Sequence, residues 1–432
     1  MGHPVATGET VPKRTSATYG DSMAGVPLVQ TTPFHPRLSE LNGTGLYRHW
    51  AGYLSALRYD LSAKYEYFAL RTSAGVFDTS PLYKYWIRGR DAERFLAGVM
   101  TRDIRLCRPG RAQYTLWCDD AGYVLEDGVL FRHGVTEFLL TCAEPNLGYF
   151  QDLIGRFDVR IDDAGADYGI LAVQGPSSRE ILLPLTAEVG TLAFFGLTQT
   201  KIADAPVTIS RTGYTGDLGF EIFVRPDDAL TVLDAVLTAG APHGLRPFGL
   251  DALLMARIEA GLMLIDAEFS SSRFAYTDQQ RVTPIELGLG WMLRGIKDDD
   301  RPFIGRTAIR REIAGRTSRW STVGLRLDWR EYDRLYTEAG LVPPKDENPV
   351  GYESMLYSSP AAAGAEPERV GYATSLMYSP VLQHHIAIAR VRPDLAVPGS
   401  RVNLELTIDH QYRTVAAEVA RLPLFNPERK TA

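Results

Sequence analysis

The stretch Ser210–Val224 constrains the fold of this chain more than any other. It contains three glycines at equal intervals, Gly213, Gly216 and Gly219. Glycine tolerates positive φ angles and lets another backbone or a ligand approach closely. The alternating run Phe220–Val224 is typical of a β-strand. We therefore predict a glycine-rich turn that carries the aromatic Tyr214 and leads into a strand that carries the carboxylate of Glu221.

Glu221 gives this stretch two competing interpretations. An uncompensated buried charge is costly, so a carboxylate inside an apolar strand predicts a partner or a ligand. An aromatic ring, open backbone and one acceptor carboxylate suit a flat heterocycle that has N–H donors. The alternative is a glycine-rich hairpin with Glu221 exposed on one strand face. Short glycine motifs are weak evidence, so the stretch taken alone favours the hairpin.

The length and composition narrow the class of protein. The 432 residues are too many for one core and predict about two to four domains. The net charge of −6 argues against a general nucleic-acid-binding surface, and the three cysteines lack CxxC spacing. No apolar run is long enough to span a bilayer, and the polar segment Met1–Pro33 lacks the apolar core of an export signal. We expect a cytoplasmic enzyme that binds neither membrane nor nucleic acid.

Helical and strand patterns are mixed up to about Arg316. Helical spacing predicts helices at Lys64–Ala74, Asn146–Phe157, Pro226–Ala239 and Leu250–Gly261. Runs of strand-forming residues predict strands at Tyr83–Arg88, Ala112–Cys118, Tyr123–Phe131 and Glu137–Cys142, and an apolar run predicts another at Ala166–Gln174. After Arg316, short β segments with Gly and Pro between them predict a separate C-terminal β domain, with Tyr336–Glu368 as an insertion. These patterns indicate an α+β chain.

Acidic residues are the main candidates for chemistry. Asp103 follows a predicted helix in a segment with few other acids, and an ordinary helix-end or turn aspartate is the alternative. Four other carboxylates surround a predicted hairpin, and we expect them to be solvated: Asp119, Asp120, Glu126 and Asp127. We also interpret Glu268–Arg281 as a surface loop, and we expect Thr283–Trp291 to lead into a strand end.

The sequence offers no metal site and no activated nucleophile. The hairpin carboxylates lack accompanying histidines, and His384 and His385 would face opposite sides of a strand. We therefore expect no metal. There is no GxSxG elbow and no P-loop, and Gly213–Gly219 does not match the dinucleotide pattern. Cys118 and Cys142 are predicted to be core thiols. Chemistry must then come from positioning, with a carboxylate that moves protons or stabilises a cation.

Short motifs extend along the chain in a fixed order. They are Gly75–Ser80, Arg102–Ile104, Pro109–Tyr114, Leu171–Pro176, Arg211–Ile222, Arg257–Gly261, Thr283–Glu286 with Trp291, Phe303–Arg306, and Val370–Ser375 with Ser379-Pro380 and Ile386-Ala387. From about Tyr47 to Pro427 the chain resembles the aminomethyltransferase family, the folate-binding T-protein of the glycine cleavage system and its relatives. One motif alone would be weak evidence, but the whole ordered series is strong evidence.

The resemblance implies a fold of three domains in a cloverleaf around a central tetrahydrofolate site, with a C-terminal β-barrel domain. On that basis we expect a flexible N-terminal arm at residues 1–35. A first, folate-binding domain is expected at 36–76 plus 144–280, a second domain at 77–143 plus 281–316, and the barrel at 317–432.

The resemblance also implies roles for individual residues. Asp103 matches the catalytic aspartate, which lies near the reacting nitrogens of folate and substrate. Tyr214 matches an aromatic residue beside the pterin, Glu221 matches the carboxylate that pairs with pterin N–H groups, and Arg257 matches a helix arginine that lines the folate site. Three further residues are expected in the folate pocket: Tyr114, Leu82 and Trp291.

Departures from the T-protein pattern favour a paralogue over the glycine cleavage enzyme itself. They include Pro81, Leu82, Cys142 and Leu253. A lipoyl carrier protein is a partner that the resemblance allows, and these departures argue against it. We expect a tetrahydrofolate-dependent one-carbon transferase that acts on a small amine, by aminomethyl or methyl transfer or by N-demethylation. The alternatives are a tetrahydrofolate-dependent O- or S-demethylase and a non-catalytic folate-binding protein.

Overall fold

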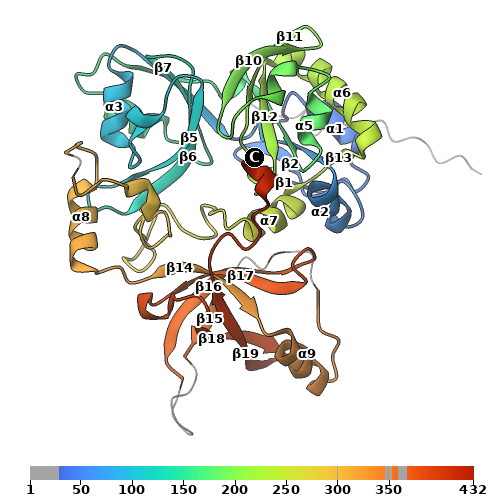
Figure 1. Ribbon diagram of the computed structural model, residues 1–432, viewed down its shortest axis with the longest axis vertical. Helices are drawn as coiled ribbons and strands as arrows, with labels where there is room; N and C mark the ends of the chain where they lie inside the picture. The colour runs from blue at the N-terminus through green and yellow to red at the C-terminus, as the bar shows by residue number, and fades with distance from the viewer. Residues whose placement is uncertain (1–28, 299, 346–348, 350–352, 359–366) are drawn as a thin grey trace, which may run out of the picture.

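The computed structural model describes residues 29–298, 300–345, 349, 353–358 and 367–432. Two units that mix helices and strands and one closed β-barrel are arranged around a common centre (Figure 1). The predicted α+β cloverleaf with a C-terminal β-barrel is confirmed. Most of the expected N-terminal arm lies outside the described residues. Thr32 and Phe34 are buried, so packed structure begins before residue 35.

The first unit is built on a six-stranded sheet with the order β10-β11-β12-β9-β3-β13. Its strands are β3 (Gly75–Asp78), β9 (Gly169–Gln174), β10 (Leu197–Ile202), β11 (Ala205–Ser210), β12 (Gly219–Val224) and β13 (Arg246–Pro247). Its helices are α1 (His35–Leu41), α2 (Ala63–Thr72), α5 (Ser178–Leu182), α6 (Ala229–Gly240) and α7 (Leu250–Glu259). A hairpin of β1 (Tyr47–Trp50) and β2 (Tyr53–Ala56) precedes α2.

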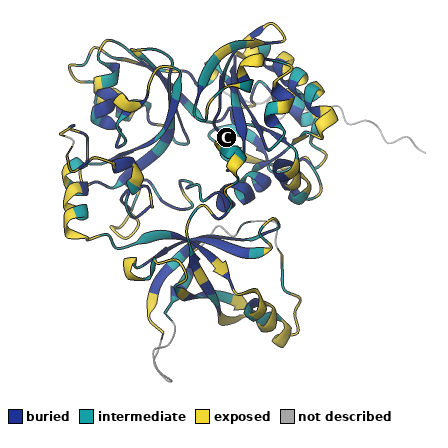
Figure 2. Cartoon of the chain, viewed as in Figure 1, coloured by how far each residue is buried: buried dark blue, intermediate teal, exposed yellow. Residues whose placement is uncertain are grey.

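The two faces of this sheet have different surroundings. Register places Glu221 of β12 level with Ala172 of β9, and Ala172 level with Phe77 of β3. Opposed residues on neighbouring strands lie on the same side, so these three share one face. Helix α7 belongs to the hydrophobic core on that face, and Figure 2 shows α7 buried near the centre of the molecule. Asp78 follows Phe77 and therefore faces the other side, where α1 and α6 pack.

The second unit is built on a five-stranded antiparallel sheet with the order β5-β6-β7-β4-β8. Its strands are β4 (Tyr83–Arg88), β5 (Arg111–Cys118), β6 (Val124–Arg132), β7 (Glu137–Cys142) and β8 (Arg160–Asp163). Helices α3 (Ala92–Val99), α4 (Leu147–Asp152) and α8 (Arg306–Gly315) accompany it. The strands predicted at 83–88 and 137–142 are confirmed residue for residue.

Three features of this unit differ from expectation. Strand β8 pairs with β4, with Tyr85 opposite Asp163, so the second sheet continues past the boundary expected at residue 144. The helix predicted to reach residue 157 ends at Asp152, and the positive φ of 52° at Gly155 excludes a right-handed helix that continues to 157. The segment predicted to lead into a strand contains instead the short 3₁₀ helix η6 (Gly290–Leu293).

The C-terminal barrel closes in the order β14-β17-β16-β15-β18-β19. Its elements are β14 (Ser321–Leu327), α9 (Trp329–Glu338), β15 (Ser354–Tyr357), β16 (Arg369–Ser379), β17 (His384–Val391), β18 (Arg401–Ile408) and β19 (Gln411–Ala420). The insertion expected at 336–368 lies partly outside the described residues. Strand β15 falls inside it and pairs with both β16 and β18, so this part belongs to the barrel wall.

Two buried carboxylates join the first unit to the barrel. Glu259 of α7 accepts a hydrogen bond from Ser379 of β16 at 2.5 Å. Glu268 forms an ion pair with Arg257 of α7 at 2.5 Å and accepts a hydrogen bond from Ser375 of β16 at 2.6 Å. The interpretation of the segment from Glu268 as a surface loop is therefore wrong at its first residue, which is only 2% exposed.

Candidate functional site

Glu221 is the only residue of β12 that is not fully buried. Its carboxylate accepts a hydrogen bond from the hydroxyl of Thr212. Burial raises the pKa of Glu221 above its ordinary value, and the hydrogen bond from Thr212 opposes that rise. Among the described residues no cation forms an ion pair with it. A carboxylate accepts several hydrogen bonds, so Glu221 has capacity left for donors from a ligand.

The glycine spacing beside Glu221 is explained by contacts within the protein. A Cβ atom on Gly213 or Gly219 would collide with the side-chain amide of Gln174, which donates to backbone carbonyls on both sides of the turn at 3.2 Å. Gly216 has a positive φ of 73°, and a Cβ atom there would collide with Ala260. The close approach that the glycines predict is therefore made by the protein's own side chains, which hold the turn in place.

Tyr214 is half-buried in this turn. Its hydroxyl donates a hydrogen bond to the backbone carbonyl of Met263. Burial raises the pKa of Tyr214, and three charged residues are close enough to influence it: Arg257, Asp127 and Glu268. Because Asp127 belongs to the second unit and Arg257 to the first, Tyr214 lies where the two units meet.

The guanidinium of Arg257 binds other residues of the protein. Its side chain is almost fully buried, and besides the ion pair with Glu268 it donates a hydrogen bond to Ser375 of the barrel at 2.9 Å. Its Nε atom has no hydrogen-bond partner among the described residues. Arg257 therefore acts on this region through its charge near Tyr214 and through its hold on the barrel.

Tyr114 and Asp127 form a pair on neighbouring strands of the second unit. The Tyr114 hydroxyl donates to Asp127 at 2.5 Å. Burial raises the pKa of Asp127 to about 6, and the bond from Tyr114 opposes the rise. The rings of Tyr114 and Trp291 lie 6.5 Å apart, and Tyr114 is also electrostatically coupled to Tyr214. The structure thus brings three of the predicted site residues together around Asp127.

The prediction that the hairpin carboxylates are solvated is wrong for Glu126 and Asp127. Glu126 is 1% exposed and accepts hydrogen bonds from the backbone N–H groups of Ala143 and Glu144 at 2.7 and 2.8 Å. Burial raises the pKa of Glu126 to about 8. The burial of Glu126 becomes apparent only from the strand pairing, because Glu126 lies opposite the fully buried Trp117.

Asp103 caps the short 3₁₀ helix η1 (Ile104–Leu106), so the expected turn role is present. It accepts hydrogen bonds from the backbone and the guanidinium of Arg105 at 2.8–3.0 Å, and Arg301 lies 4.0 Å away. Burial alone would raise the pKa of Asp103, but the hydrogen bonds from Arg105 and the charges of both arginines outweigh it and lower that pKa. Asp103 is therefore ionised at neutral pH, as a base or a cation-stabilising group must be.

Asp103 opens onto a shallow cleft of about 250 Å³, a volume that includes open solvent at its mouth. The other lining residues are Thr101, Met292, Leu293, Arg294, Ile296, Arg301, Phe303 and Arg306. Trp291 directly precedes Met292 in η6, so this short helix links the Asp103 cleft to the region around Tyr114. Leu82 stands apart. It is half-buried just before β4, and no hydrogen bond or ring contact among the described residues joins it to the other candidates.

The Tyr114–Asp127 bond predicts a specific pH dependence. Tyr114→Phe removes a donor that stabilises the ionised carboxylate, so the pKa of Asp127 should rise above its value of about 6. The measurement is the pH titration of the Asp127 carboxyl carbon by NMR, with Asp127→Asn used to assign the signal. An unchanged titration midpoint in Tyr114→Phe would show that the hydrogen bond does not form.

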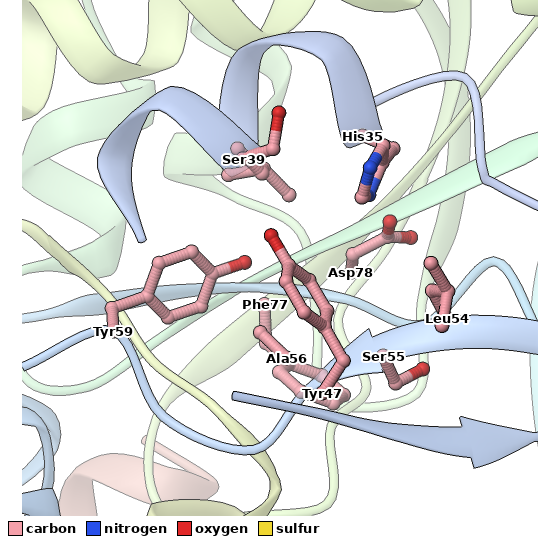
Figure 3. Close-up of a pocket in the computed structure, with 10 residues that line it drawn as sticks. His35, Ser39, Tyr47, Leu54, Ser55, Ala56, Tyr59, Phe77 and Asp78 are labelled. Atoms are coloured by element: carbon pink, nitrogen blue, oxygen red, sulfur yellow. The ribbon is translucent and has the colours of Figure 1, made fainter. Parts of the chain in front are cut away.

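A second cleft lies on the opposite face of the first sheet (Figure 3). It lies between α1, the β1–β2 hairpin and the end of β3 and measures about 340 Å³, including open solvent at its mouth. His35, Tyr47, Tyr59 and Asp78 give it a polar lining, and the hydroxyls of Tyr47 and Tyr59 point into it. Asp78 lies on the face of the sheet away from Glu221, so this cleft is separate from the candidate site.

The cysteines are buried, and burial raises the pKa of all three thiols: Cys107, Cys118 and Cys142. The predicted core thiols at the last two positions are confirmed. Within the described ranges, no helix has the length and apolar character to cross a bilayer. In the same ranges, no three or more His, Cys, Asp and Glu side chains are placed together to hold a metal ion.

Two family models match nearly the whole described chain. The GCVT N-terminal domain matches residues 35–297, and the glycine cleavage T-protein C-terminal barrel domain matches residues 322–426. The chain therefore belongs to the aminomethyltransferase (glycine cleavage T-protein) family, whose general chemistry is tetrahydrofolate-dependent one-carbon transfer. The resemblance drawn from the motifs is confirmed.

Individual relatives place the chain within this family. The aminomethyltransferase of Saccharopolyspora erythraea is 33% identical over 399 residues, which cover 91% of this chain and 97% of that protein. The trimethylamine-oxide aldolase of Ruegeria pomeroyi is 32% identical over 379 residues, which cover 84% of this chain and 43% of that protein. The glycine cleavage system aminomethyltransferase T of Bartonella henselae has the same fold, with a TM-score of 0.75 at 22% identity over 92% of this chain and 98% of that one.

Proposed function

We propose that this protein transfers a methyl or aminomethyl unit between a small amine and tetrahydrofolate, as a paralogue of the glycine cleavage enzyme. The observation that carries the proposal is Glu221, a partly exposed carboxylate in a strand that is otherwise buried. An ion-pair role does not account for it, because no described cation pairs with it. A ligand with N–H donors does account for it.

The residues around Glu221 fit a reduced pterin. The Glu221 carboxylate would accept hydrogen bonds from the pterin N–H groups, and such charge-assisted bonds are stronger than neutral ones. The half-buried ring of Tyr214 would contact the flat face of the heterocycle. Tetrahydrofolate, when bound, supplies the nitrogen atoms that accept or donate the one-carbon unit.

Asp103 would act on the amine. When the bond between the one-carbon unit and the amine nitrogen breaks, its electron pair stays on that nitrogen. A cationic nitrogen before this step is stabilised by a nearby carboxylate. The lowered pKa keeps Asp103 ionised at neutral pH, so it can stabilise that cation and accept a proton. These roles favour an amine over an ether or a thioether, which carries no positive charge.

The relative named trimethylamine-oxide aldolase supports a nitrogen-containing substrate, because its matching region covers most of this chain. The departures at Pro81, Leu82, Cys142 and Leu253 support a substrate other than the aminomethylated lipoyl carrier.

The test is a panel of methylated amines, methyl ethers and methyl thioethers, each incubated with the protein and tetrahydrofolate. We expect methyl-tetrahydrofolate, detected by mass spectrometry, from at least one amine and from no ether or thioether. Product from an ether or thioether alone would replace the amine assignment with O- or S-demethylation. Failure of tetrahydrofolate to bind in an equilibrium titration would remove the folate function altogether.

A further inference from the structure

Arg102, the residue before Asp103, is a half-buried cation without an acidic partner. Its guanidinium lies over the ring of Trp291, with 5.0 Å between Cζ and the ring centroid. One N–H group donates to the backbone carbonyl of Tyr114 at 3.1 Å. Among the described residues no aspartate or glutamate forms an ion pair with Arg102.

The neighbouring arginines are satisfied in other ways. Arg105 is paired with Asp103 at 2.8 Å, and Arg257 with Glu268 at 2.5 Å. Arg301 donates hydrogen bonds to the backbone carbonyls of residues 97, 100 and 101. A guanidinium that loses hydration without gaining an acid is unfavourable, and burial accordingly lowers the pKa of Arg102. The remaining N–H groups of Arg102 are thus available to an anion from outside the chain.

We propose that Arg102 binds a carboxylate of the one-carbon donor, so that the substrate is an N-methylated amino acid rather than a simple methylamine. The proposal rests on the proposed function. The planar guanidinium matches a carboxylate through paired N–H···O bonds, and stacking on Trp291 holds that plane in one orientation. Asp103, one residue away, carries the opposite charge. A zwitterion bound between the two residues would place its ammonium group toward Asp103 and its carboxylate toward Arg102.

A carboxylate could also come from the glutamate tail of tetrahydrofolate, so the experiment separates the two sources. Substrate probes are used in pairs that differ only in the carboxylate: N,N-dimethylglycine with N,N-dimethylethylamine, and N-methylated alanine and phenylalanine with their decarboxylated amines. Folate probes are tetrahydrofolate and tetrahydropteroic acid, which lacks the glutamate. Dissociation constants are measured for all probes, and kcat and KM for those that react.

The variants are Arg102→Gln, Arg102→Lys and the control Arg330→Gln. Arg330 stacks on Trp329 at 5.5 Å in the barrel unit, so it is matched in chemistry but lies in another unit. The wild type should bind at least one amino acid about 10- to 100-fold more tightly than its decarboxylated amine. Arg102→Gln should abolish this preference by raising the KM for the amino acid, with little change in kcat. Arg102→Lys should restore part of it, and Arg330→Gln should leave it intact.

Three results would overturn the inference. One is a wild type with no preference for the carboxylate in any pair. Another is an Arg102→Gln variant that keeps the preference. The third is an Arg102→Gln variant that weakens the binding of tetrahydrofolate but not the binding of tetrahydropteroic acid, because Arg102 would then bind the glutamate tail of the folate. If wild-type tetrahydrofolate binding itself is absent, the proposed function fails instead, so the two failures are distinguishable.

Discussion

Asp103→Asn should lower kcat by about 10²- to 10⁴-fold, the usual contribution of a positioned proton-transfer group. Asparagine keeps the size of the side chain and can still cap η1, because its amide oxygen accepts the backbone bond from Arg105. It loses the negative charge that would stabilise a cationic nitrogen. The dissociation constant for tetrahydrofolate should therefore stay nearly unchanged while turnover collapses, which single-turnover kinetics and an equilibrium titration measure separately.

The chain offers a matched control for this variant. Asp328 caps α9 in the barrel by accepting backbone hydrogen bonds from Arg330 and Glu331 at 3.0 and 3.1 Å. Asp328→Asn makes the same chemical change at another helix start and should leave turnover at the wild-type level. If Asp103→Asn is equally active, the carboxylate of Asp103 is a cap and nothing more.

Glu221→Gln should weaken tetrahydrofolate binding by about two orders of magnitude. Two hydrogen bonds from N–H donors to a charged acceptor contribute about 1.5–3 kcal/mol each, and the glutamine amide would turn N–H donors toward the pterin's own donors. Glu418→Gln, on the exposed side of β19, is the control and should bind like the wild type. The readout is the dissociation constant from an equilibrium titration.

The stability of the same variant tells a ligand-binding role from a structural one. The pKa of Glu221 is raised by burial. The stability linked to its protonated form is therefore present at low pH and lost as the pH rises through the folded-state pKa. At neutral pH the ionised Glu221 carboxylate lowers the free energy of unfolding, so Glu221→Gln should unfold at the same or a higher temperature than the wild type. A clear fall in the unfolding temperature would mean that Glu221 holds the sheet together and does not serve a ligand.

The regular parts of the fold could be predicted from local patterns because they depend on neighbours in the chain. Runs of strand-forming residues in Tyr83–Arg88 and Glu137–Cys142 identified β4 and β7 with their bounds. Helix α9 and strand β15 were not predicted. Apolar residues of α9 recur at helical spacing after the N-cap Asp328, so this helix did carry a local signal, although it buries only Tyr332. The short β15 is specified by its pairing with β16 and β18, which a local pattern does not show.

The candidate site shows the same limit. Glu126 and Asp127 looked like hairpin charges because a strand pattern does not reveal which acids have donors across the sheet or in a following loop. Glu268 looked like a loop residue because its partners come from α7 and from the barrel, 107 positions further on at Ser375. The three glycines of the opening stretch allowed either a ligand or another part of the chain to approach closely, and Gln174 and Ala260 occupy the space that they leave.

The links from Glu259 and Glu268 to the barrel limit how the molecule can open. Swinging the barrel away would strip both carboxylates of hydrogen bonds from Ser375 and Ser379. Each buried group left without its partner costs about 1–3 kcal/mol, so an open form of this kind would be rare. The barrel is therefore a fixed wall and not a lid. Under the proposed function, tetrahydrofolate and the substrate must then enter by a route that leaves the hydrogen bonds from Ser375 and Ser379 intact.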